Sequence, residues 1–91
     1  MITRYRRHPE LRLAAVEGEG VVLHLGTRRY FSVNDSGLTL LELLAAPHSL
    51  GDLVAVLAER YEVTADDARE SVRAFVDGCL AARLLEIDGD A

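Results

Sequence analysis

The chain is poor in the residues that several kinds of site require. Its 91 residues include one cysteine, Cys79, and neither tryptophan nor lysine. One cysteine excludes an internal disulfide and a cysteine-rich zinc site. Because Cys79 falls on the apolar stripe of a predicted helix, we expect a core thiol. No run of about 18 apolar residues is present, as a membrane span would need. The basic N-terminus lacks the apolar segment of a signal peptide, so we expect a cytoplasmic protein.

The chain also lacks the usual catalytic and metal-binding patterns. Its histidines, His8, His24 and His48, are isolated and never share the i, i+4 spacing of a helical zinc site. We expect His24, within a strand, to lie on a polar sheet face. No glycine-rich phosphate loop precedes a helix, and no serine has the frame of a nucleophile elbow. We therefore expect no catalytic residue, no metal site and no cofactor, in a protein that is not an enzyme.

Charge is divided unevenly along the chain. Residues 1–30 hold six arginines and three glutamates, a net charge of +3, whereas residues 31–91 hold four arginines and twelve acids, a net charge of −8. The last predicted helix, residues 64–84, carries four acids against three arginines. A helix that reads DNA meets a dense row of phosphates, so this balance argues against nucleic-acid binding. It favours basic partners instead.

Residue patterns predict three strands in the first part of the chain. Residues 11–16 alternate weakly, residues 21–25 are β-branched and apolar, and residues 28–33 form a third strand. Glycine-containing turns separate the strands, and the Gly-Thr pair at 26–27 fits a two-residue hairpin connection. Sequential strands joined by tight turns form an antiparallel meander, whose first and third strands are edges. Residues 1–10 are expected to be an irregular tail.

Three amphipathic helices are predicted to follow, each opened by a residue that caps helix N-termini. The run Asn34-Asp35-Ser36-Gly37 offers caps for the first helix, with Ser36 as the expected cap, and the other caps are Ser49, in a short capping box, and Thr64. Apolar residues then fall on one side of each segment, as in helices that cover a core. The apolar stretch 84–87 is expected to dock as a short extended piece, and residues 88–91 to fray.

Together these elements predict a single α+β domain over residues 11–87. It would hold a three-stranded antiparallel sheet followed by three helices. The helices should cover one face of the sheet, because a small sheet is not stable alone. The last two helices, joined by a short turn, resemble a helix-turn-helix. The arrangement is winged-helix-like.

The edge strand 28–33 is the best candidate for a binding site. An unpaired edge presents backbone N–H and C=O groups that a second chain satisfies by strand addition. Phe31 and Val33 are expected to face the core, and the third helix to lie beside the strand. The residues expected to bind a peptide are Arg28, Arg29, Tyr30, Phe31, Ser32, Val33, Asp67, Arg69, Val72, Arg73 and Val76. Pairing of the same edge with a second copy, or DNA binding, are the alternatives.

Several segments resemble the PqqD-like family. They are residues 22–25 (VLHL), 30–37 (YFSVNDSG), 41–44 (LELL), 49–53 (SLGDL), 57–63 (LAERYEV) and 75–85 (FVDGCLAARLL). The turn in the second segment and the link in the fifth are the most specific parts, and the resemblance covers about residues 11–87. Two positions depart from the family pattern. Leu40 or Leu41 stands where an aromatic residue is common in the first helix, and Arg83 replaces a glycine.

The resemblance implies a RiPP recognition element, a non-catalytic domain that binds the leader segment of a ribosomally synthesised precursor peptide. In the family the leader adds as a strand to the third strand and packs against the third helix. A discrete domain of this size is similar to the lasso-peptide type, which presents the leader to a separate cysteine-type leader peptidase. A helper protein for a radical-SAM peptide-modifying enzyme, as in pyrroloquinoline quinone biosynthesis, is the alternative.

Overall fold

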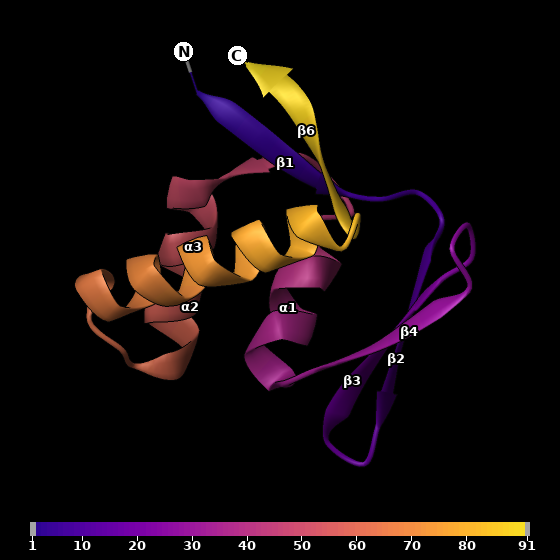
Figure 1. The fold of residues 1–91 in the computed structure, drawn as a ribbon. Coiled ribbons are helices and arrows are strands. Elements are labelled where there is room, and N and C mark those ends of the chain that lie inside the picture. Colours follow the sequence, from indigo (N-terminus) through magenta and orange to yellow (C-terminus); the bar gives the residue numbers. More distant parts are fainter. Residues whose placement is uncertain (1, 91) are drawn as a thin grey trace.

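The computed structural model describes residues 2–90, with side chains through Asp88, as two three-stranded sheets beside three helices (Figure 1). The elements in chain order are β1 (Thr3–Arg7), β2 (Leu11–Val16), β3 (Glu19–His24), β4 (Arg29–Val33), α1 (Asp35–Leu43), β5 (His48–Ser49), α2 (Leu50–Tyr61), α3 (Ala65–Ala81) and β6 (Leu85–Asp90). One sheet has the order β2-β3-β4 and the other β5-β1-β6. In Figure 1 the first sheet projects to one side of the helices, and β1 and β6 run side by side above them.

The predicted meander is confirmed for β2, β3 and β4. Both outer strands pair antiparallel with β3, and Val22 at its centre lies opposite Leu13 of β2 and Phe31 of β4. Val22 is fully buried in the core that α1 helps to form. α1 therefore covers one face of this sheet, where we expected the three helices to do so together, and the order of the strands makes β2 and β4 its edges.

The connection from β3 to β4 differs from the two-residue turn that we expected. Four residues, 25–28, join the strands. The Arg28 N–H donates to the His24 carbonyl at 2.7 Å, and Arg28 has a φ of 59°, in the left-handed region. Because the Arg28 N–H closes the loop, strand pairing begins one residue later than predicted, at Arg29 opposite His24.

Two predictions about the ends of the chain were wrong. Residues 1–10 are not an irregular tail, because β1 pairs with both β5 and β6. Residues 88–90 do not fray, because β6 pairs with β1 as far as Asp90, opposite Thr3; Ala91 lies outside the described residues. These strands are held by partners distant in the sequence, so their local residue pattern carried little signal. The predicted sheet followed by helices is correct, and a second sheet is added to it.

β1 also completes the C-terminal end of α1. The Arg7 N–H donates to the Leu44 carbonyl at 2.7 Å, and the Arg7 guanidinium donates to the Leu41 carbonyl at 3.1 Å. The last carbonyls of a helix have no partner within the helix, and α1 has no basic residue in its own last turn. Arg7 supplies both the missing donors and the favourable positive charge from another element.

The predicted caps Ser49 and Thr64 are confirmed, and the first helix is capped by Asn34 of the predicted run and not by Ser36. The side-chain oxygens of Asn34 and Thr64 accept the backbone N–H three residues later, at 2.8 and 3.1 Å. Ser49 and Asp52 form a complete capping box, in which each side chain accepts from the backbone N–H of the other residue. These local contacts explain why the helix starts were readable from the sequence.

One cluster of buried apolar residues connects the helices to both sheets. Its members include Leu11, Val22, Leu41, Leu53, Val72 and Leu85. Cys79 belongs to the same cluster, as expected, and burial raises the pKa of its thiol to about 11. The thiol is therefore protonated at neutral pH and unsuited to nucleophilic attack. None of the helices within residues 2–90 combines the length and hydrophobicity that crossing a membrane requires.

Candidate functional site

The outer edge of β4 has no strand partner within residues 2–90, because β4 is the last strand of its sheet. The loop before β4 shows which of its backbone groups point outward. The His24 carbonyl is directed into the hairpin, where it accepts from Arg28. His24 lies opposite Arg29, so the backbone groups of this first pair face each other across the hairpin.

Alternate residues of an antiparallel strand direct their backbone groups to the same side. The backbone N–H and C=O groups of Phe31 and Val33 therefore face β3, as those of Arg29 do. The N–H and C=O groups of Tyr30 and Ser32 point away from β3, toward the open edge. The candidate site thus offers two donors and two acceptors that an additional strand would satisfy.

The side chains of β4 also divide as predicted. Phe31 and Val33 are partly buried against the core, on the same face as Arg29. Tyr30 and Ser32 are exposed on the other face, Tyr30 with 72% of its surface. Arg28 is exposed in the preceding loop. The open edge therefore lies between an apolar inner face and an exposed aromatic side chain.

One residue of α3, Phe75, packs against the first turn of α1, just after β4 ends. A Cβ atom built on Gly37, in the first turn of α1, would lie 3.0 Å from a ring carbon of Phe75 in α3 and 3.2 Å from the Val33 Cβ. These distances are tighter than ordinary contacts, so Gly37 permits this approach by having no side chain. The Phe75 ring is therefore held beside the start of α1, close to the point where the open strand ends.

A hollow of about 180 Å³ opens between the start of α1, the second half of α2 and the first half of α3. It is lined by Ser36, Leu57, Tyr61, Val63, Asp67 and Ser71. The Tyr61 hydroxyl donates to the Asp35 carboxylate at 2.7 Å and lies 3.0 Å from the Thr39 hydroxyl, which fixes one wall of the hollow. The space suits a single apolar side chain, and the Asp67 carboxylate would attract a basic group nearby.

The structure separates the α3 residues that we expected at one site. Asp67 lines the hollow. Val72 and Val76 are 0% and 2% exposed, so they belong to the core and do not line an open cleft as expected. Arg69 and Arg73 line a different groove, shared with α2. The apolar stripe of a helix is buried in the core. The helix surface beside a neighbouring strand is therefore formed by the residues that flank the stripe.

Sequence reasoning included Asp67 but not the other residues on its flank of α3. Residues three and four apart share a helix face, so Ser71, Ala74 and Gly78 continue this flank along the helix. All are exposed, and a Cβ atom at Gly78 would meet nothing within 4 Å. The spacing of small residues from Asp67 onward was the signal available in the sequence. It marks a flank with room for another chain.

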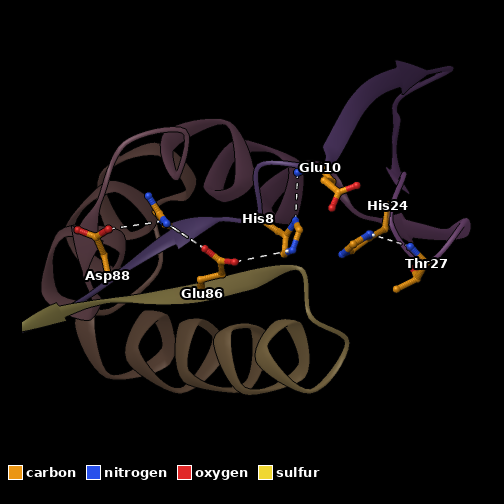
Figure 2. Close-up of polar contacts among 7 residues, drawn as sticks. His8, Glu10, His24, Thr27, Glu86 and Asp88 are labelled. Carbon is orange, nitrogen blue, oxygen red and sulfur yellow. Dashed lines mark hydrogen bonds and ion pairs between the residues drawn. The ribbon is translucent and has the colours of Figure 1, made fainter.

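A separate polar cluster joins the two sheets at His8 and His24, whose ring centroids are 4.4 Å apart (Figure 2). His24 is 3% exposed, so its expected place on a polar face was wrong. Its Nδ1 accepts the Thr27 N–H at 3.2 Å, while its Nε2 has no partner within the described residues. His8 accepts the Glu10 N–H at 3.0 Å, and its Nε2 lies 3.7 Å from Glu86. The two rings serve packing between the sheets.

No group of three or more histidine, cysteine, aspartate or glutamate side chains within the described part of the chain is placed to hold a metal ion. The edge of β4 offers backbone hydrogen bonds, and the hollow between α1, α2 and α3 offers an apolar space and one carboxylate. These groups bind an extended peptide well, and they include no activated nucleophile beside a base.

Comparison with known proteins agrees with this geometry. A family model described as coenzyme PQQ synthesis protein D (PqqD) matches residues 19–85. No curated protein gives a significant match. A lasso peptide synthetase B1, solved with a leader peptide, is 26% identical with a TM-score of 0.75, and the match covers 90% of this chain and 96% of that one.

Two further solved structures share the fold. TbiB1 in complex with the TbiA(beta) leader peptide is 23% identical with a TM-score of 0.76, covering 94% of this chain and 98% of that one. The PqqD part of Methylobacterium extorquens PqqCD, described as a stand-alone RiPP recognition element, is 20% identical with a TM-score of 0.76. That match covers 91% of this chain and 88% of the other.

Proposed function

The chain belongs to the PqqD family, and we propose that it is a RiPP recognition element that binds the leader segment of a ribosomally synthesised precursor peptide. The observation that carries this function is the unpaired outer edge of β4 beside α3. Two proteins of the same fold were solved with leader peptides, which supports the proposal. The domain acts by binding alone and leaves chemistry to a separate enzyme.

The leader adds as a further strand along β4. Its backbone pairs with the outward N–H and C=O groups of Tyr30 and Ser32. Each such hydrogen bond contributes only about 0.5–1.5 kcal/mol net, so side-chain anchors must supply the remaining affinity and the selectivity. Backbone pairing fixes the register of the leader, and the surfaces on either side of the strand select its sequence.

Those two surfaces are chemically different. Successive side chains of a strand point to opposite faces, so alternate leader residues enter the hollow beside α3 and lie next to Tyr30. The hollow favours an apolar side chain, with Asp67 close to any neighbouring basic group. Gly78 leaves space on the same flank of α3. Arg28 and Arg29, at the other end of the edge, favour an acidic leader residue and speed association.

The bound leader is presented to a separate cysteine-type leader peptidase, as in lasso-peptide biosynthesis. The likeness to a lasso peptide synthetase B1 over 90% of this chain favours this partner. The family description, coenzyme PQQ synthesis protein D, favours the alternative of a helper for a radical-SAM peptide-modifying enzyme. Adding each purified enzyme to the complex of this protein with its precursor separates the two functions, because only the true partner will process the peptide.

A proline in the open edge tests strand addition. Ser32→Pro removes the Ser32 N–H, which points outward, and leaves the hydrogen bonds between β4 and β3 in place. Calorimetric titration with the synthetic leader of the cognate precursor should show at least tenfold weaker binding to this variant than to the parent.

The matched control is Ala15→Pro, which places the same substitution on β2, the opposite edge of the same sheet. This variant should bind the leader as the parent does. Circular dichroism must show that both variants are folded. Unchanged affinity in a folded Ser32→Pro variant, or equal weakening in both variants, would contradict pairing along β4.

A further inference from the structure

A second groove lies between α2 and α3, away from β4. Its volume is about 290 Å³. Val54, Ala55 and Ala58 contribute to the α2 wall, and Arg69 and Arg73 contribute to the α3 wall. In Figure 1 α2 and the first half of α3 cross on the side of the helices opposite β4. The groove is therefore a separate surface from the leader edge, with an apolar interior and two cationic side chains.

The two arginines give this groove a charge opposite to its surroundings. Residues 31–91 carry a net charge of −8. Arg69 pairs with Asp66 at 3.2 Å, but the two side chains are 60% and 95% exposed, and exposed pairs contribute little. Arg73 makes no hydrogen bond or ion pair within the described residues. Both guanidinium groups are available to a carboxylate from another molecule.

The positions of these residues on α3 allow both surfaces to be occupied together. Each residue turns an α-helix by about 100°, so Arg69 and Arg73 lie nearly opposite Asp67 and Ser71. The buried stripe around Val72 separates the two flanks. A chain that lies along β4 and the Asp67 flank does not reach the groove.

We propose that the groove between α2 and α3 docks the leader peptidase, through an apolar side chain of the peptidase flanked by carboxylates. The apolar group fills the space beside Val54 and Ala55, and the carboxylates pair with Arg69 and Arg73. This inference rests on the proposed leader-binding function, because an adaptor that presents a leader needs a second surface for the enzyme. The groove meets that need on a face that the leader leaves open.

The test uses the full chain, the purified leader peptidase encoded with the precursor, and fluorescein-labelled leader. Arg73→Glu reverses one charge, and Ala55→Trp fills the groove from an exposed position. Each change should weaken peptidase binding at least tenfold, measured by biolayer interferometry with and without leader. Leader affinity, measured by fluorescence anisotropy, should stay within twofold of the parent. The matched control is Arg60→Glu, an exposed arginine of α2 outside the groove, which should change neither.

The outcomes separate the two proposals. If the parent fails to bind the peptidase, or if both groove variants bind it normally, the docking surface is wrong. If the groove variants also lose the leader by tenfold, the groove is part of the leader site and not a second surface. If the parent binds the peptidase but not the leader, the proposed leader function is wrong. The docking proposal is then still supported by the peptidase binding measured without leader.

Discussion

At the scale of single residues, the buried thiol of Cys79 makes stability depend on pH in the alkaline range. Burial raises its pKa from 9.0 to about 11 in the folded protein. Between these values the unfolded chain releases the thiol proton and the folded chain keeps it, so the free energy of unfolding falls as pH rises. Below pH 9 both states keep the proton, and this penalty is absent.

The comparison with Cys79→Ala isolates this effect from other titrating groups. Relative to that variant, the parent should lose about 1–2 kcal/mol of unfolding free energy between about pH 9 and 11, measured by urea titration. At pH 8 the parent should be the more stable protein, because the alanine leaves a small cavity. A constant difference across this pH range would show that the thiol does not titrate with a raised pKa.

Burial of single polar residues was beyond the reach of sequence reasoning. His24 occupies a strand position that suits a polar face, yet it is buried because its ring meets His8 from a distant segment and accepts from Thr27 in the loop. Val72 and Val76 were expected to bind the peptide, although they fall on the apolar side of their helix. A side chain with almost no exposed surface serves the core alone.

At the scale of elements, local contacts made the helix starts predictable and distant contacts hid the second sheet. Ser49 and Asp52 complete a capping box within four residues of each other. The segment TRYRR of β1 has no apolar alternation, and it becomes a strand because β6 pairs with it from the other end of the chain. Sequence patterns report interactions between near neighbours, and β1 has its partners far away.

Arg7 connects β1 to the C-terminal end of α1. Its guanidinium donates to the Leu41 carbonyl at the end of α1. Arg7→Ala should lower the free energy of unfolding by about 1–2 kcal/mol, because a helix carbonyl loses a charged donor. The measurement is chemical denaturation followed by circular dichroism. Arg4→Ala, at an exposed position of the same strand, should change stability by less than about 0.5 kcal/mol. Equal effects of the two substitutions would mean that Arg7 does not support α1.

At the scale of the whole molecule, the sequence was enough to find the open edge but not the wall opposite it. Three sequential strands joined by short turns predict a meander whose third strand is an edge. This prediction correctly placed Tyr30 and Ser32 on an edge strand. Which flank of α3 faces β4 depends on how the helix is rotated in the core, a tertiary property that Gly37 and Phe75 help to set. For this reason the sequence grouped Asp67 with Arg69 and Arg73, which the structure places on two different hollows of α3.

The two surfaces of the molecule should respond differently to salt. Raising salt from 0.1 to 1 M shortens the Debye length from about 10 Å to about 3 Å, which screens exposed charges. Leader binding rests mainly on backbone pairing and an apolar hollow, with the exposed charges Arg28, Arg29 and Asp67 only at the two ends, so salt should screen a minor part of its affinity. Peptidase docking rests on two exposed arginines of one sign. We therefore expect leader affinity to change by less than about threefold and peptidase affinity to fall by about tenfold.

Fluorescence anisotropy for the leader and biolayer interferometry for the peptidase, on the same preparation across a salt series, measure both effects. Arg73→Glu provides the internal control, because the variant should have weak peptidase binding that salt no longer reduces. A parallel fall of both affinities would indicate one shared electrostatic surface. Since the −8 charge of residues 31–91 is common to both measurements, a difference between the two salt responses would come from the local charges, Arg69 and Arg73 on one flank of α3 and Asp67 on the other.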